Sequence, residues 1–178
     1  MLDTLISSRT RLKLLLRFFL NPESSAYLRG LAGEFGESSN AVRLELNRFQ
    51  EAGMLVSESK GNKKLYKANM RHPFYKDIHR LLLKYVGIDS LVEEVIGRLG
   101  EMQKVYLTGD YACGRDSGII DLVLVGKVDK AYLSHLVEKA EKLISRKVRF
   151  LTYEEQEWKQ QYPHESPDAG NFLLLWEK

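Results

Sequence analysis

Two helix-forming segments separated by a tight break stand close together between Leu28 and Ala52. The first is expected to be a helix of about two turns that is broken at Gly36. The second is expected to start at residues 38–40, because Ser and Asn side chains accept hydrogen bonds from the free N–H groups of a first helical turn. Gly53 ends it, since Gly readily takes the left-handed conformation. Few simple soluble modules place these signals so close together.

A basic hairpin is predicted to follow. Residues 54–60 and 63–69 are two short strands around Gly61-Asn62, a two-residue loop that is able to adopt positive φ. The order of helix, turn, helix and hairpin is the layout of a winged helix-turn-helix. A hairpin edged with lysines also discourages edge-to-edge pairing of strands, and this is the alternative interpretation.

The second helix has two different faces. At about 100° per residue, Val42, Leu46 and Phe49 share one side. The opposite side carries a guanidinium, two amides and one aliphatic group, from Asn40, Arg43, Leu44 and Asn47. Arg pairs with guanine, Asn with adenine, and an aliphatic group contacts a thymine methyl, so this face suits a major groove. An ordinary amphipathic surface helix has the same two-sided character and is the competing interpretation.

The residues predicted to contact DNA therefore lie on this helix and on the hairpin: Ser38, Ser39, Asn40, Arg43, Leu44, Asn47, Arg48, Lys60, Lys63, Lys64 and Lys67. Residues 1–87 hold 15 Lys/Arg and 8 Asp/Glu, a net charge of +7, whereas residues 88–178 have a net charge of −4. The positive charge lies in the half that contains the helix-turn-helix, as nucleic-acid binding requires. This charge argues against a winged helix that contacts only proteins.

Composition excludes several classes of site. Cys113 is the single cysteine, so the chain has no internal disulfide and no cysteine-rich metal cage. The four histidines have no close ligand spacing, and surface or capping roles are expected for His72 and His79. No signal peptide and no span of about 20 apolar residues is found, which predicts a soluble, cytoplasmic protein.

Three further helices are expected around this region. One covers residues 8–19 and ends at Asn21-Pro22. Its apolar character indicates a helix covered on several sides, either in the core or by a dimer contact. Another opens at His72-Pro73, with an apolar face at Ile78, Leu81, Leu82, Tyr85 and Val86. Gly87 marks a hinge, after which Ser90 is expected to cap a helix reaching about Leu99.

From Met102 the pattern changes to alternating strands and helices. Strands are predicted at residues 104–108, 119–125, 148–152 and 172–176, and helices at residues 131–144 and 154–161. The first of these helices is expected to turn five residues inward: Leu133, Leu136, Val137, Ala140 and Leu143. The segment at 119–125 is a nearly continuous apolar run, typical of a buried strand. These elements predict a small α/β domain with a covered sheet.

The first half, across about residues 5–87, resembles the winged-helix regulators of the ArsR/MarR type. That resemblance implies a dimeric protein that binds double-stranded DNA. The metal-sensing members of that family use a cysteine pair in the recognition region, and this chain has none there. Metal sensing is therefore not expected.

The second half, across about residues 90–178, resembles the minimal nucleotidyltransferase fold. The resemblance rests on Val-Tyr-Leu-Thr-Gly-Asp-Tyr-Ala-Cys-Gly at 105–114 and Ile-Ile-Asp-Leu-Val-Leu-Val at 119–125. In that family a glycine turn cradles the triphosphate, and an Asp-x-Asp pair on the next strand holds Mg²⁺. The resemblance implies nucleotide-binding positions at Gly109, Asp110, Gly114 and Asp121.

The chain departs from that pattern where catalysis depends on it. Asp110 replaces the family's Ser or Gly, Ile119 stands in place of the first aspartate, and Asp121 matches the second. Arg149 occupies a position where a third carboxylate is often found. Asp110, Asp116 and Asp121 are the catalytic candidates if the domain is active. One matching carboxylate does not reproduce a two-metal site, so an inactive domain is expected.

Together these features predict a two-domain α+β / α/β protein. Residues 1–87 form a winged helix-turn-helix and residues 88–178 a small nucleotidyltransferase-like α/β domain. The expected function is that of a DNA-binding transcriptional regulator with an inactive sensor or assembly domain; an active Mg²⁺-dependent nucleotidyltransferase is the alternative. The expected partners are double-stranded DNA, a second copy of the chain and a nucleotide or small-molecule effector. No metal or cofactor is expected unless the transferase is active.

Overall fold

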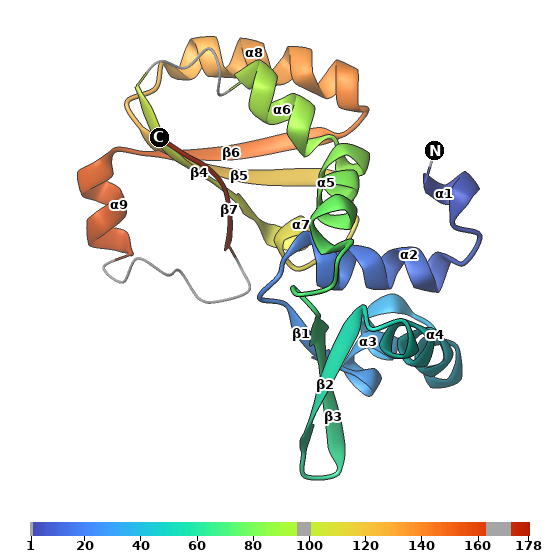
Figure 1. Ribbon diagram of the computed structural model, residues 1–178. Coiled ribbons are helices and arrows are strands. Elements are labelled where there is room, and N and C mark those ends of the chain that lie inside the picture. The colour runs from blue at the N-terminus through green and yellow to red at the C-terminus, as the bar shows by residue number, and fades with distance from the viewer. Residues whose placement is uncertain (1, 96–100, 163–171) are drawn as a thin grey trace. The chain divides into compact units, whose positions relative to one another are not determined.

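The computed structural model describes residues 2–95, 101–162 and 172–178 (Figure 1). The chain divides into two compact units, residues 1–82 and residues 83–178. The boundary lies inside helix α5 (Tyr75–Val86). In the described part of the chain, no helix combines the length and the apolar character needed to cross a membrane.

The first unit begins with a short helix α1 (Leu2–Leu5) and continues with α2 (Arg9–Leu15). The Ser8 Oγ accepts a hydrogen bond from the Arg11 N–H at 3.2 Å, which fixes the start of α2. The helix then widens into a π-helical segment η1 (Leu16–Leu20), in which Phe18 and Phe19 are fully buried. The predicted first helix is thus present and lies in the core of its unit.

Helices α3 (Leu28–Phe35) and α4 (Ser39–Glu51) follow. Gly36 separates them with φ of 63°, the left-handed conformation expected at that break. The Ser38 Oγ accepts from the Ala41 N–H at 3.1 Å and caps α4. The apolar face of α4 packs inward, with these buried side chains: Val42, Leu46 and Phe49. Both helices and the break between them are confirmed.

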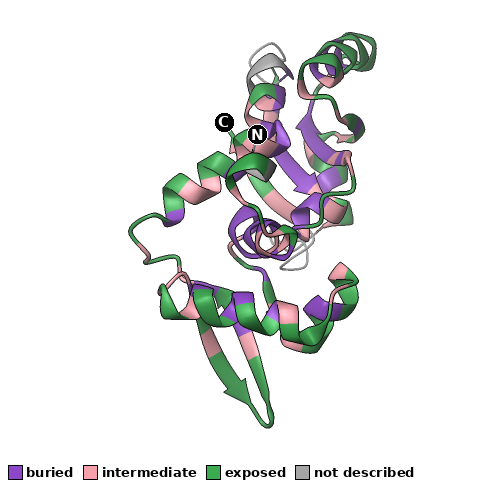
Figure 2. Cartoon of the chain, turned by 90° about the vertical axis from the view of Figure 1, so that its right-hand side faces the viewer, coloured by how far each residue is buried: buried purple, intermediate pink, exposed green. Residues whose placement is uncertain are grey.

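A three-stranded antiparallel sheet completes the unit, in the order β1-β3-β2. The hairpin of β2 (Leu55–Lys60) and β3 (Lys63–Ala68) has Lys60 opposite Lys63 across the two-residue turn. Figure 2 shows this hairpin projecting from its unit with an exposed tip. Strand β1 (Ser25–Tyr27) pairs with β3 and was not predicted, because three residues are too few to show an alternating pattern.

Helices α5 and α6 (Ile88–Val95) correct three sequence expectations. Pro73 precedes α5 by two residues instead of lying in its first turn. Leu81, expected on the apolar face, is 41% exposed. Ser90 lies inside α6 and does not cap it, because Gly87, with φ of 88°, already breaks the chain and lets the helix start at Ile88. The expected continuation to Leu99 lies outside the described residues.

The second unit contains a four-stranded sheet in the order β6-β5-β4-β7. Its strands are β4 (Met102–Thr108), β5 (Ile119–Gly126), β6 (Lys147–Tyr153) and β7 (Phe172–Glu177). The central pair β4 and β5 is antiparallel, as is β4 with β7, whereas β5 and β6 are parallel. A short helix α7 (Gly109–Ala112) directly follows β4 where only a glycine turn was expected.

Helix α8 (Lys130–Ile144) connects the two parallel strands and lies beside α6 on one side of the sheet (Figure 1). Four of its five predicted inward residues are buried, namely Leu133, Leu136, Val137 and Ala140. Leu143 is 65% exposed, so its prediction was wrong. The helix ends one residue later at Ile144, and Ser145 follows it in the left-handed conformation.

The opposite face of the sheet is partly covered by α9 (Glu155–Gln161). The buried Trp158 ring stacks on Tyr106 of β4 at 5.0 Å between centroids, and Phe172 of β7 meets Tyr106 edge-on at 6.1 Å. Tyr153 and Tyr162 extend this aromatic cluster. The fold of the second unit is therefore a mixed sheet with helices on one side and aromatic packing at one end of the other.

Candidate functional site

The outer face of α4 is open to solvent. Asn40, Arg43, Leu44 and Asn47 are all exposed, and Leu44 is 53% exposed. The Arg43 Nη1 donates to the Asn40 Oδ1 at 3.1 Å, which aligns the two groups side by side. This face offers hydrogen-bond donors, acceptors and one apolar group in a single row, the set that reads base edges.

Two of the remaining predicted residues, Ser38 and Arg48, have partners within α4. The Ser38 hydroxyl is engaged as the helix cap, while Ser39 is exposed in the first turn. The Arg48 Nη1 donates to the Glu45 Oε1 at 2.9 Å and keeps 52% of its side chain exposed. Ser38 thus sets the start of the helix, and Arg48 lies at the edge of the exposed face.

The hairpin places the four predicted lysines in solvent. Lys60 lies opposite Lys63, and Lys64 lies opposite Ser59. The Lys67 ammonium pairs with the Glu58 carboxylate on the neighbouring strand. The positive charge of the hairpin is therefore concentrated toward its tip, where Lys60, Lys63 and Lys64 cluster. All eleven residues predicted to contact DNA are exposed.

A buried acidic group on α4 escaped the sequence prediction. Glu45 is 5% exposed, and its carboxylate accepts from the Arg11 Nε at 2.9 Å. Burial acts to raise the pKa of Glu45, but hydrogen bonds and charge from Arg11 and Arg48 outweigh it, so the pKa lies below the ordinary value. The signal in the sequence was an acidic residue next to Leu46 on an otherwise apolar helix face.

Two further ion pairs connect α2 and η1 to the helix α3 region. The Lys13 ammonium lies 3.2 Å from the Glu37 carboxylate, and it donates to the Phe35 carbonyl at 2.8 Å. The Arg17 Nε lies 3.4 Å from the Glu34 carboxylate. Together with the Arg11–Glu45 pair, these contacts hold α3 and α4 against α2 and η1. The outer face of α4 stays free.

In the second unit, the glycine turn and the predicted carboxylate come together. Thr108 and Asp121 face each other across β4 and β5. Gly109 follows with φ of 66°, and a Cβ added there would lie 2.4 Å from the Asp121 Oδ2. Ile119 and Asp121 point to the same side of β5 because strand side chains alternate. The spacing of the Asp-x-Asp pattern is preserved, with an apolar residue in its first position.

The Asp121 carboxylate is held by Arg149. The Arg149 Nε donates to Oδ1 at 2.6 Å and its Nη2 donates to Oδ2 at 2.9 Å. The pKa of Arg149 lies above its ordinary value because of the hydrogen bond and charge of Asp121, with a smaller contribution from the charge of Asp110. Asp110 in turn accepts from both Nε and Nη2 of Arg115.

Asp116 belongs to a separate cluster. Its carboxylate pairs with the Arg146 Nη2 at 2.9 Å and accepts from the Tyr111 hydroxyl. Arg146 also donates to the Tyr111 hydroxyl at 2.7 Å and to the Tyr85 carbonyl at 3.2 Å. Gly114, with φ of 76°, lies in the buried turn after α7. The three acidic candidates are therefore divided between different arginine partners.

This donor set does not fit the pair of metal ions that the nucleotidyltransferase resemblance implies. A two-metal site needs carboxylates that converge with free oxygen lone pairs. Both oxygens of Asp121 accept from Arg149, and Ile119 supplies no ligand. Within residues 2–95, 101–162 and 172–178, no group of three or more His, Cys, Asp or Glu side chains is arranged to hold a metal ion.

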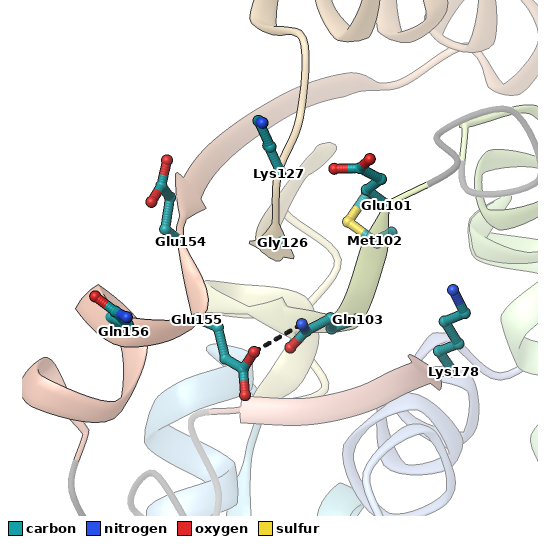
Figure 3. Close-up of a pocket in the computed structure, with 9 residues that line it drawn as sticks. All are labelled: Glu101, Met102, Gln103, Gly126, Lys127, Glu154, Glu155, Gln156 and Lys178. Carbon is teal, nitrogen blue, oxygen red and sulfur yellow. Dashed lines mark hydrogen bonds between the residues drawn. The ribbon is translucent and has the colours of Figure 1, made fainter.

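A shallow pocket of about 510 Å³ lies at the other end of this sheet (Figure 3). It includes Gly126 at the end of β5, five residues and roughly 16 Å along the strand from Asp121. Its lining mixes both signs of charge, from Glu101, Lys127, Glu154, Glu155 and Lys178. Gln103 closes one side by donating to Glu155 at 2.8 Å. No predicted site residue lines it.

No protein-family model and no curated protein matches the chain. Solved structures give partial likenesses. A chain from a mutant of the toxin–antitoxin pair MntA–HpeT aligns with a TM-score of 0.40 and 17% identity, over 51% of this chain and 72% of that one. A chain from the Shewanella oneidensis complex of a tri-AMPylated HEPN toxin with its MNT antitoxin gives 0.37 and 13%, over 52% and 71%.

A candidate nucleotidyltransferase from Sulfolobus solfataricus aligns with a TM-score of 0.34 and 22% identity, over 56% of this chain and 83% of that one. These neighbours are nucleotidyltransferase-like or belong to toxin–antitoxin complexes, and none of the three is described as a DNA-binding regulator. At such identities and TM-scores they do not assign the chain to a family. Its function is therefore inferred from its own geometry.

Proposed function

We propose that the first half of the chain, residues 1–87, is a winged helix-turn-helix that binds double-stranded DNA, with α4 in the major groove and the β2–β3 hairpin along the phosphate backbone. The observation that carries this proposal is the exposure of all eleven predicted contact residues, which lie on α4, on its Ser38 cap and on one hairpin. DNA recognition requires some groups that contact bases and others that contact phosphates, and both kinds are present. Amides and a guanidinium lie on α4, and ammonium groups lie on the hairpin.

The packing beneath α4 supports the proposal. A reading helix must keep its orientation while its outer face stays free, and α4 meets both conditions. Its inner face is buried through Val42, Leu46 and Phe49, and Arg11 holds Glu45 from α2. The outer groups of Arg43 and Asn47 remain in solvent.

The test is a mobility-shift or anisotropy titration of the full chain with duplex DNA from upstream of its own coding sequence. Binding is expected to weaken steeply between about 50 and about 200 mM salt, because lysine–phosphate contacts release counterions. Replacing Lys60, Lys63 and Lys64 with Gln should reduce affinity for every sequence. Lys142→Gln, an exposed lysine on α8, is the matched control. Absence of any shift at low salt would refute the proposal.

We further propose that the protein is a transcriptional regulator that acts as a homodimer and that residues 88–178 serve as its sensor or assembly domain. Light scattering coupled to gel filtration measures the dimer directly. A thermal shift with ATP, CTP, GTP or UTP measures effector binding, since any ligand that binds only the folded chain raises its melting temperature. A monomer with no nucleotide response would contradict this part of the proposal while leaving DNA binding intact.

A second candidate function is Mg²⁺-dependent nucleotidyl transfer. The specific observation in its favour is the contact of the Gly109 turn with Asp121, which reproduces the glycine-then-acid order of that fold. The ion pairs of Asp121 and Asp110 with arginine weigh against it. Transfer from labelled ATP, CTP, GTP or UTP that is lost in Asp121→Ala would establish this activity. No transfer from any of the four would leave the sensor role.

A further inference from the structure

Asp121 and Arg149 form a two-point ion pair on adjacent strands of the second unit. They are register partners in the parallel ladder of β5 and β6, so their side chains leave the same face of the sheet. The Asp121 side chain is 19% exposed and the Arg149 side chain 69% exposed. The guanidinium therefore covers the carboxylate from the solvent side.

Gly109 leaves the space beside that carboxylate free of any side chain. A Cβ added to Gly109 would come within 2.4 Å of the Asp121 Oδ2. Each carboxylate oxygen accepts a hydrogen bond from Arg149, which uses one lone-pair direction of each. A divalent ion such as Mg²⁺ needs oxygen ligands at about 2.0–2.1 Å and near-octahedral geometry. The guanidinium stands in the solvent-facing position from which an ion would reach both oxygens.

The charge around Asp121 is also balanced without a metal ion. The nearby Asp110 pairs with Arg115, through Nη2 to Oδ1 at 2.6 Å. Two carboxylates thus face two guanidinium groups. The net charge of these four groups is zero, whereas a divalent ion is attracted to a site with net negative charge.

We propose that Arg149 is a built-in cation that takes the place of a divalent metal ion beside Asp121, and that this end of the sheet consequently does not take up Mg²⁺ or Mn²⁺. The inference concerns the second unit alone and stands apart from DNA binding. It assigns Arg149 a defined role, that of excluding metal from a site whose glycine turn and aspartate are otherwise in place.

The test is Mn²⁺ binding to the full chain, measured as loss of the free-ion signal in electron paramagnetic resonance. The wild-type chain is expected to bind no Mn²⁺ through Asp121. Arg149→Asp puts two carboxylates on facing positions of β5 and β6, and its affinity for Mn²⁺ should rise at least about ten-fold. The double variant Asp121→Asn/Arg149→Asp should return to the wild-type level, because one carboxylate of the pair is gone.

Two results would overturn the proposal. One is Mn²⁺ binding by the wild-type chain that Asp121→Asn abolishes. The other is a folded Arg149→Asp variant with no gain in affinity, since Arg149 would then not be the group that keeps the ion out. Circular dichroism establishes folding. Should Arg149→Asp fail to fold, Arg149→Gln replaces it: a smaller gain is expected, and no gain counts against the proposal.

Discussion

The Glu45 carboxylate on α4 accepts hydrogen bonds from Arg11 on α2, at 2.9 Å from Nε and 3.3 Å from Nη2. It is almost fully shielded from water, so the two arginines beside it replace its hydration. Glu45→Gln keeps the shape of the side chain and removes the charge. The expected loss is about 1.5–3 kcal/mol of unfolding free energy, the range for hydrogen bonds to charged groups. Thermal denaturation measures it.

The exposed Glu58, which pairs with Lys67 on the hairpin, is the control for that experiment. Glu58→Gln should leave the melting temperature unchanged, because exposed ion pairs contribute little. Equal effects of the two substitutions would show that burial of Glu45 is unimportant.

The lowered pKa of Glu45 predicts how this stabilisation depends on pH. Since the folded-state pKa lies below 4.5, the stabilisation is complete above pH 4.5 and is lost as pH falls through the folded-state pKa. The difference in melting temperature between wild type and Glu45→Gln should therefore shrink as the solution is acidified below pH 4.5. Melts recorded at a series of pH values test this. A difference that grows on acidification would contradict it.

Arg43 and Lys64 should affect DNA binding in different ways. Arg43→Ala removes a group that reads base edges and should cost about 1–3 kcal/mol on the preferred sequence, with little loss on unrelated duplexes. Lys64→Ala should weaken all duplexes alike and lower the slope of log affinity against log salt by about one. Anisotropy titrations on specific and scrambled duplexes separate the two. Identical behaviour of both variants would contradict the assigned roles.

Gly109 should be harder to replace than Gly118, another glycine with positive φ. Gly109→Ala adds backbone strain of about 1–3 kcal/mol and also drives a methyl group into the Asp121 carboxylate. Gly118 has φ of 76° with open space around it, so Gly118→Ala reports the strain alone. The melting temperature should fall further for Gly109→Ala. Equal falls would mean that Asp121 moves aside at no cost.

Tyr111 should remain protonated where exposed tyrosines ionise. Burial, and then the hydrogen bond to Asp116, raise its pKa, while the hydrogen bond from Arg146 acts in the opposite direction. The neutral phenol therefore stabilises the fold fully below pH 10, and this stabilisation is lost as pH rises through the folded-state pKa. Tyr111→Phe should not change the number of tyrosines that titrate near pH 10 by ultraviolet absorbance. Loss of one titrating group would contradict the prediction.

Local signals predicted most of the fold. Residues with a local effect on the chain were predicted correctly: Ser38 caps α4, Gly36 breaks the chain before it, and Gly61-Asn62 forms the hairpin turn. Their effect depends on neighbours in sequence. The prediction that Ser90 caps a helix was wrong, because a different local signal determined where the helix starts. Ser90 has the chemistry of a cap, but Gly87 had already placed the helix start at Ile88.

Tertiary contacts account for what the sequence missed. Glu45 is an ordinary acidic residue until α2 brings Arg11 to it, and no periodicity within α4 reveals this. Leu143 fits the apolar period of α8, yet it is 65% exposed in the fold. The departure at Arg149 was visible in the sequence. Its bond to Asp121 was not, because it depends on the register of two strands that are far apart in the chain.

The register of the hairpin places Lys60 and Lys63 directly opposite each other beside the turn. Like charges on facing strand positions repel, so the tip of the free hairpin is under electrostatic tension. A row of phosphates would relieve that repulsion. Binding of a polyanion would therefore stabilise the hairpin tip. Slower amide hydrogen exchange at Gly61 and Asn62 would report that binding without any change elsewhere in the fold.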